Sequence, residues 1–124
     1  MPDLSAIDET LVRARSGLDR VRPEQLGEEI ASGAFVIDIR PLEQRQRDGE
    51  LPGAIVIDRN VLEWRLDPTS PHRLPIATGH DVRLILVCNE GYSSSLAAAS
   101  LQELGLHRAT DLVGGFQAWH PGTG

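Results

Sequence analysis

"RLILVCNEGYSSSLAAASLQELG", residues 83–105, joins a strand-like run to a helical run through a polar turn. Residues 83–87 are mostly apolar, which is typical of a short buried strand. Residues 94–105 predict a helix that ends at a glycine. The cysteine between them, Cys88, is the only one in the chain. The stretch therefore predicts a strand, a tight loop and a helix, with a thiol at the end of the strand.

The same alternation of strand and helix continues on both sides of this stretch. Further strands are predicted at 35–39, 55–58 and 110–113, and helices at 4–18, 20–33, 41–47, 61–66 and 114–119. No hairpin signal joins neighbouring strands. The sequence therefore predicts an α/β protein with a mostly parallel central sheet and helices on both faces.

Length and composition limit the possible functions. The 124 residues suffice for one hydrophobic core, and the net charge of −6 argues against nucleic acid or an anionic membrane as a partner. No run approaches the roughly 20 apolar residues of a membrane span, and the first residues do not resemble a signal peptide. A lone cysteine forms no internal disulfide, so we expect a cytoplasmic protein. The four histidines are scattered, and we expect neither metal nor cofactor.

Cys88 lies where ligands bind in open α/β sheets, at the carboxyl end of a strand. The loop that follows it can turn several backbone N–H groups inward, and the start of the next helix adds partial positive charge. Both effects favour the thiolate, which is the reactive form of cysteine. From position alone, a reactive nucleophile and a buried structural cysteine remain equally open.

Four stretches, taken in order, resemble the rhodanese-like (sulfurtransferase) domain family. Residues 36–58 resemble its strand ending in Asp-x-Arg and its Gly-x-Ile-Pro-Gly-Ala turn, and 85–94 resemble its Cys-x-x-Gly active loop. Residues 97–106 resemble the helix that follows, and 111–119 resemble the Gly-Gly-aromatic-x-x-Trp ending. The resemblance implies a rhodanese-like fold.

The resemblance also divides the chain. It implies a rhodanese-like domain over 23–119, preceded by an N-terminal helical extension over 1–22 that packs on the domain. Residues 120–124 form a C-terminal tail. The sequence does not indicate the oligomeric state.

Transferred to this sequence, the family resemblance implies that Cys88 accepts a sulfane sulfur and becomes a persulfide. The donor would be a small sulfane-sulfur compound or a protein persulfide. The cradle for the sulfur would be the loop Asn89, Glu90, Gly91, Tyr92, Ser93 and Ser94. Asp38 and Arg40 match the Asp-x-Arg pair, for which we expect a structural role.

Two residues of the loop depart from the family pattern. Ser93 stands where the family usually has arginine, and Glu90 adds a negative charge two residues from Cys88. Both changes disfavour an anionic donor such as thiosulfate and tend to raise the thiol pKa. We therefore expect weak thiosulfate activity.

Three other functions are alternatives to sulfur transfer. A related phosphatase needs arginine at the sixth position after the cysteine, where this chain has Ser94. A serine hydrolase is suggested by "GYSSS" (91–95), but the final glycine of the nucleophile elbow is missing, and these serines are better explained as loop donors and helix caps. The main alternative is a non-catalytic rhodanese-like module that binds a partner protein.

Overall fold

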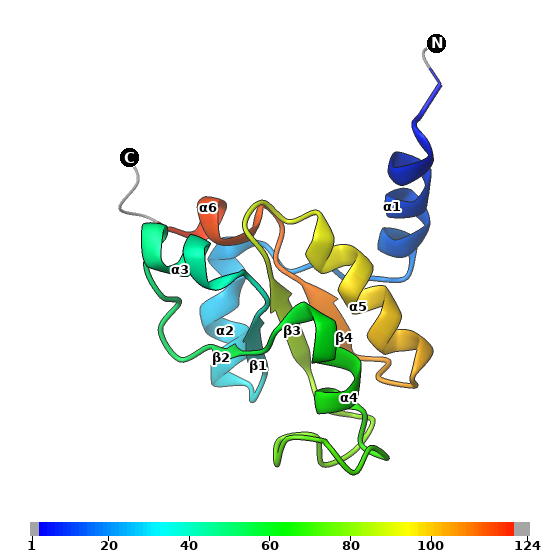
Figure 1. The fold of residues 1–124 in the computed structure, drawn as a ribbon, viewed down its shortest axis with the longest axis vertical. Helices are drawn as coiled ribbons and strands as arrows, with labels where there is room; N and C mark the ends of the chain where they lie inside the picture. Colours follow the sequence, from blue (N-terminus) through cyan, green and yellow to red (C-terminus); the bar gives the residue numbers. More distant parts are fainter. Residues whose placement is uncertain (1–2, 121–124) are drawn as a thin grey trace.

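The computed structural model describes residues 3–120, which form one parallel sheet between two layers of helices (Figure 1). The sheet has the strand order β2-β1-β3-β4, and every pair is parallel. Its strands are β1 (Phe35–Asp38), β2 (Ile55–Val56), β3 (Leu84–Val87) and β4 (Ala109–Asp111). The predicted parallel α/β architecture is confirmed.

Helices connect the strands and cover both faces of the sheet. The α-helices are α1 (Ala6–Ser16), α2 (Leu26–Ala31), α3 (Leu42–Asp48), α4 (Leu62–Leu66), α5 (Ser93–Glu103) and α6 (Gly115–Trp119). Two 3₁₀ turns, η1 (Pro23–Gln25) and η2 (Arg59–Val61), precede α2 and α4. Pro23 opens η1 because its fixed φ suits the first helical position.

Alternate side chains of the strands enter two separate cores. On one face Ile37 and Leu86 pack with Leu101 of α5 and Leu62 of α4. On the other face the strand residues pack with α2 and α6, where Phe116 is fully buried. All four residues of β3 are buried, so the strand that carries Cys88 at its end is fixed from both sides.

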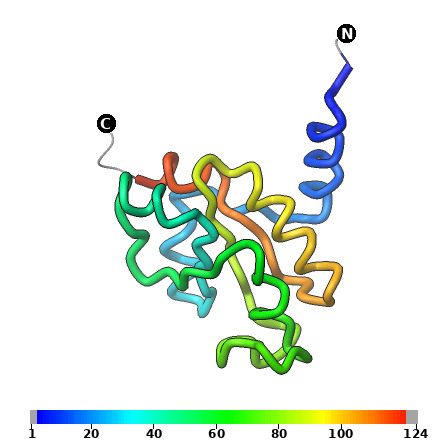
Figure 2. Tube along the Cα trace, viewed as in Figure 1, coloured from blue at the N-terminus to red at the C-terminus, as the bar shows by residue number. Residues whose placement is uncertain are grey.

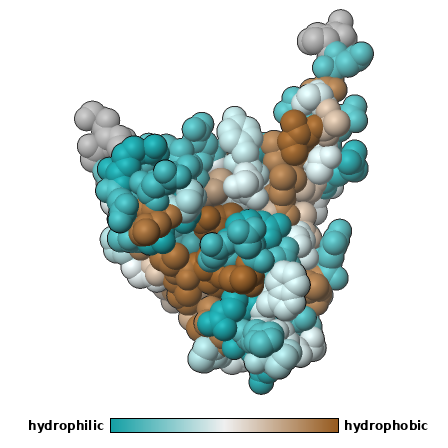
Figure 3. Space-filling model, in the orientation of Figure 1, coloured by the Kyte–Doolittle hydropathy of each residue, from teal (hydrophilic) through white to brown (hydrophobic). Residues whose placement is uncertain are grey.

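Helix α1 lies against α5 but contributes little to the core. It has no buried residue, and Ile7 is 59% exposed. It projects beyond the rest of the molecule beside α5, and apolar side chains remain visible on it (Figures 1 and 3). Hydrophobic periodicity predicted the helix correctly, but it did not show that little protein lies opposite its first turns.

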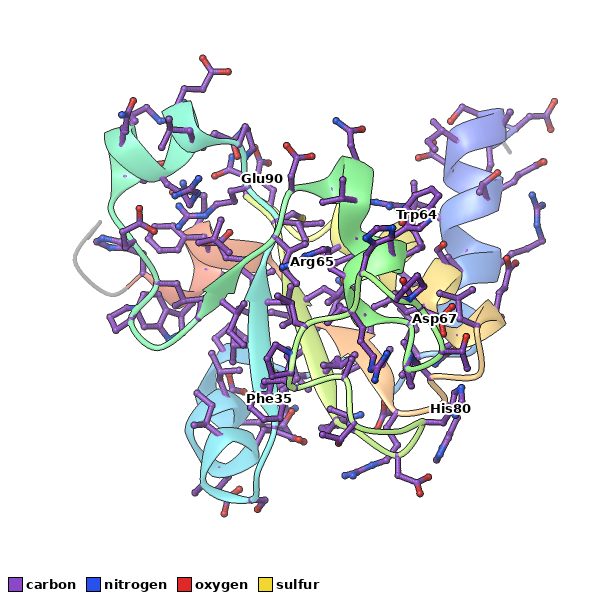
Figure 4. All side chains as sticks on the ribbon, turned by 60° about the horizontal axis from the view of Figure 1, so that its bottom comes forward. Phe35, Trp64, Arg65, Asp67, His80 and Glu90 are labelled. Carbon is purple, nitrogen blue, oxygen red and sulfur yellow. The ribbon has the colours of Figure 1, made fainter. Side chains whose placement is uncertain are left out.

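Not every large apolar side chain of the helices is buried. Ile30 of α2 and Trp64 of α4 are both exposed, and Trp64 is labelled in Figure 4. After β2 the carboxylate of Asp58 accepts the Asn60 N–H at 2.8 Å and starts η2. Because Asp58 leaves the sheet to make this cap, β2 is shorter than predicted.

The chain between α1 and α2 brings the N-terminal residues to the sheet. It crosses from α1 toward α2 past the end of β4 (Figure 2), and Val21 forms a parallel bridge with Leu112. Val21 is buried in the second core. No helix within residues 3–120 is long and apolar enough to cross a membrane. The predicted tail lies outside the described residues apart from His120, which packs against Phe116.

Candidate active site

Cys88 directly follows β3 and lines a hollow of about 360 Å³. The residue is buried, with 6% of its surface exposed. The hollow is open at one side and is lined by Ile39, Arg40, Pro41, Gln44, Cys88, Asn89, Glu90, Tyr92 and Ser93. Residues from two strand ends therefore surround one thiol, at the carboxyl edge where such sheets bind ligands.

The loop after Cys88 folds back over the sulfur. The backbone N–H of Gly91 donates to Sγ at 3.1 Å, and the backbone N–H of Ser94 does so at 3.4 Å. The thiol in turn donates to the Ser94 hydroxyl oxygen at 3.2 Å. Gly91 adopts a φ of +88°, which a residue with a side chain rarely takes. The sequence predicted this cradle of backbone donors, and the structure brings Gly91 and Ser94 onto the sulfur.

These hydrogen bonds control the acidity of Cys88. Burial would raise the pKa of the thiol, but the Ser94 hydroxyl, the Ser94 N–H, the Ser93 hydroxyl and the Gly91 N–H all lower it. As a result the pKa of Cys88 lies below that of an ordinary cysteine. This direction agrees with the expectation that the loop N–H groups favour the thiolate. The tendency of Ser93 and Glu90 to raise the pKa, expected from the sequence, does not outweigh the hydrogen bonds around the sulfur.

A buried carboxylate lies behind the loop. Asp111, the last residue of β4, has no exposed surface and accepts hydrogen bonds from the Ser94 and Ser95 hydroxyls, each at 2.7 Å. The serines were expected to cap α5, but the cap position is Tyr92 and no side chain caps the helix. Ser94 and Ser95 instead tie the first turn of α5 to β4.

Two arginines that precede the first strand complete this arrangement. Arg20 binds both carboxylate oxygens of Asp111, through Nε at 2.8 Å and Nη2 at 3.2 Å. Arg20 and Arg15 both donate to the carbonyl oxygen of Gly91, at 3.0 and 2.8 Å. Arg15 also donates to the Ser95 hydroxyl and lies over the Tyr92 ring. The N-terminal extension therefore holds the back of the loop.

The sequence analysis missed Arg15, Arg20 and Asp111. The only available signal was the charge of Asp111 in an otherwise apolar strand, since a carboxylate inside a sheet needs a buried partner. The register explains its place: Asp111 pairs with Leu86, two residues before Cys88.

The glycine pair before α6 supports the loop from the other side. The Phe116 N–H donates to the Cys88 carbonyl at 2.9 Å, and the Gln117 N–H donates to the Asn89 carbonyl at 3.1 Å. A methyl group on Gly115 would lie 2.5 Å from the Cys88 carbonyl oxygen, and one on Gly91 would lie 2.7 Å from the Gly114 nitrogen. Only glycine allows these two backbone turns to lie so close together.

Asp38 and Arg40 form a buried ion pair beside the hollow. Arg40 Nη2 and Asp38 Oδ2 are 2.8 Å apart, and both side chains are fully buried. The guanidinium also donates to the Gly49 carbonyl and stacks on the Phe116 ring at 3.8 Å. This stacking contact compensates in part for Nη1, which has no hydrogen-bond partner within residues 3–120. The pair fixes the end of β1 next to the loop.

The remaining loop residues face the solvent side of the hollow. Glu90 and Tyr92 are exposed, and Asn89 is half-buried with its amide near the Glu90 carboxylate at 3.5 Å. Within residues 3–120 no acceptor takes a hydrogen bond from the backbone N–H groups of Asn89, Glu90, Tyr92 or Ser93. The loop therefore offers donors to a ligand. Metal binding has no support here: the described residues contain no group of three or more histidine, cysteine, aspartate or glutamate side chains that could hold an ion.

Comparison with known proteins identifies the family. Residues 22–121 match the model of the rhodanese-like domain, which is most of the chain. The chain belongs to the rhodanese-like domain family. A thiosulfate sulfurtransferase GlpE of Ectopseudomonas mendocina is 33% identical to this rhodanese-like protein over 104 residues, which cover 84% of this chain and 86% of the relative.

Two further relatives show how far the similarity extends. A solved structure from Rhodopseudomonas palustris, described as a protein of unknown function and possible tyrosine phosphatase, has a TM-score of 0.82 and 33% identity. It covers 96% of this chain, and 93% of its own chain is matched. The adenylyltransferase and sulfurtransferase UBA4 of Candida albicans is 33% identical over 85 residues, 68% of this chain but 19% of that protein. This rhodanese-like fold thus occurs both alone and within a larger enzyme.

Proposed function

We propose that this protein is a rhodanese-type sulfurtransferase or persulfide carrier that moves sulfane sulfur through Cys88. One observation carries the proposal: Cys88 lines an open hollow, its sulfur receives two backbone N–H groups, and the pKa of its thiol is lowered. A thiol in such a setting is a nucleophile at neutral pH. The sulfurtransferase relatives support the same chemistry.

The reaction is a transfer of one sulfur atom in two steps. The Cys88 thiolate attacks the outer sulfur of a donor, so a new S–S bond forms while the donor's S–S bond breaks and its electron pair leaves with the departing group. With thiosulfate the departing group is sulfite. An acceptor nucleophile then attacks the outer sulfur of the Cys88 persulfide, which regenerates the thiolate. The N–H groups of the loop stabilise negative charge on sulfur in both steps.

The donor is a small sulfane-sulfur compound or a protein persulfide, and thiosulfate is a slow donor. The loop residues Asn89 through Ser94 contain no cation, and the carboxylate of Glu90 lies at the hollow. Both features disfavour a doubly charged anion. We assign the protein to the cytoplasm, where a lone thiol stays reduced.

Mass spectrometry of the intact protein tests this function directly. After exposure to thiosulfate, polysulfide or the persulfide of a cysteine desulfurase, we expect one added sulfur on Cys88 that a reductant removes. The Cys88→Ser variant should gain none. If Cys88 takes sulfur from no donor and also resists alkylation in the folded protein, Cys88 is a structural core residue. The non-catalytic interaction module is then the better explanation.

A phosphatase is the second candidate, because the Rhodopseudomonas palustris relative is described as a possible one. The site argues against it. Arg40 lines the hollow, but its guanidinium is bound to Asp38, and Arg15 and Arg20 donate to the Gly91 carbonyl behind the loop. Hydrolysis of p-nitrophenyl phosphate by the wild-type protein and not by Cys88→Ser would favour the phosphatase.

A further inference from the structure

Residues that precede the family domain reach the reactive loop. The match to the domain begins at residue 22, and Arg20 lies before it. Its guanidinium binds the Asp111 carboxylate at 2.8 and 3.2 Å and the Gly91 carbonyl at 3.0 Å. The Arg20 side chain is 19% exposed and that of Asp111 is fully buried. Arg20 therefore forms an ion pair with β4 and a hydrogen bond with the loop at the same time.

Asp111 depends on this contact. A buried carboxylate is stable only when hydrogen bonds and an opposite charge replace the water it has lost. Asp111 receives two bonds from Arg20 and one each from the hydroxyls of Ser94 and Ser95. Without Arg20, the carboxylate keeps two neutral donors and has no cation to pair with within residues 3–120.

We propose that Arg20 is a positioning residue for Cys88 and that it acts through Asp111. Arg20 orients the Asp111 carboxylate, which holds the hydroxyls of Ser94 and Ser95. These hydroxyls fix the first turn of α5, where the N–H of Ser94 reaches the sulfur at 3.4 Å. The proposal rests on the proposed function in so far as Cys88 is the reacting group, and it makes the extension part of the active site.

The other charged groups near Cys88 come from different elements. Arg40 at the end of β1 and Glu90 in the loop line the same hollow. Asp111 lies behind Ser94, and Arg15 and Arg20 lie behind the loop on the Gly91 carbonyl. Among the described residues, Arg20 is the cation that bonds Asp111, so its removal tests this contact without touching Arg40 or Glu90.

The test is the rate of Cys88 alkylation by iodoacetamide as a function of pH, measured on the full chain. We expect Arg20→Met to shift the midpoint upward by about one pH unit, because a misplaced Ser94 no longer stabilises the thiolate. In the Asp111→Asn background the same change should shift it by less than about a third of that, since the amide no longer binds the guanidinium strongly. Arg22→Met, which removes an exposed arginine paired with Glu24, is the matched control and should cause no shift.

Each result decides for or against the proposal. No shift in Arg20→Met would overturn it, and so would an equal shift in the Asp111→Asn background, because Arg20 would then act by charge or through the Gly91 carbonyl. Arg20→Lys keeps the charge and loses the forked contact, so we expect a smaller upward shift. If Arg20→Met does not fold, Arg20→Lys in both backgrounds gives the same comparison. Alkylation needs no sulfur donor, so a negative result here is distinct from a failure of persulfide formation.

Discussion

At the scale of single residues, the hydroxyl of Ser94 connects the thiol to the buried charge behind it. It accepts from the Cys88 thiol at 3.2 Å and donates to Asp111 at 2.7 Å, while its own backbone N–H faces the sulfur. One residue therefore supplies both a side-chain and a backbone contact to the reacting atom. This explains why a serine occupies this buried position at the end of the loop.

Replacing Ser94 with alanine should raise the Cys88 pKa, because the Ser94 hydroxyl lowers that pKa in the wild-type protein. Alkylation at pH 7 should slow about tenfold, whereas at pH 10 it should approach the wild-type rate. Ser100→Ala on the same helix, which loses only a bond to Glu63, is the control. An unchanged pH profile in Ser94→Ala would mean that the backbone N–H groups alone set the acidity.

Local sequence signals predicted part of this site. Cys88 at a strand end and Gly91 in a tight turn follow from short-range rules, because strand, loop and helix are contiguous in the chain. The pairing of Arg20 with Asp111 spans 91 residues, and no local rule links them. The prediction that the serines cap α5 failed for the same reason, because their buried partner Asp111 is distant from them in the sequence.

At the scale of elements, α6 and the active loop are two backbone turns that interlock. The N–H groups at the start of α6 bond the carbonyls of Cys88 and Asn89, and Gly115 adopts a φ of +62°. The family-like ending of the sequence, which suggested only a last helix, is thus part of the site. The Gly-Gly-aromatic-x-x-Trp motif could be recognised in the sequence, but its contact with the active loop is visible only in the folded structure.

Gly115→Ala should destabilise the protein by about 2 kcal/mol or more. The new methyl group would meet the Cys88 carbonyl oxygen at 2.5 Å, and a positive φ costs a side-chain residue about 1 kcal/mol in addition. Urea denaturation measures the loss, and the alkylation profile should change with it because the loop must move. Gly79→Ala is the control, since a methyl group there meets nothing within 4 Å. Equal stability of the two variants would contradict the interlocking of the turns.

At the scale of the whole molecule, the rhodanese-like domain carries an N-terminal extension. Its helix α1 contacts the domain but adds no residue to the hydrophobic core. No residue of α1 is buried, whereas Val21 and the chain that follows belong to the second core. The hydrophobic periodicity of residues 4–18 predicted a helix. It did not predict whether another part of the protein would cover the apolar face of that helix. Stability and reactivity are therefore expected to depend on different parts of the extension.

Deleting residues 2–17 separates these two roles, because it removes α1 and Arg15 but keeps Arg20 and Val21. We expect the thermal midpoint to fall by only a few degrees, since few buried contacts are lost. Persulfide formation on Cys88 should slow several-fold, because Arg15 no longer donates to the Gly91 carbonyl and the Ser95 hydroxyl.

Arg15→Met in the full chain should reproduce the slower reaction. Arg13→Met, whose guanidinium bonds only the exposed Thr10 hydroxyl, should not. A shortened protein that reacts at the full rate would show that Arg20 alone holds the loop, and one that unfolds would show that α1 is part of the folding unit.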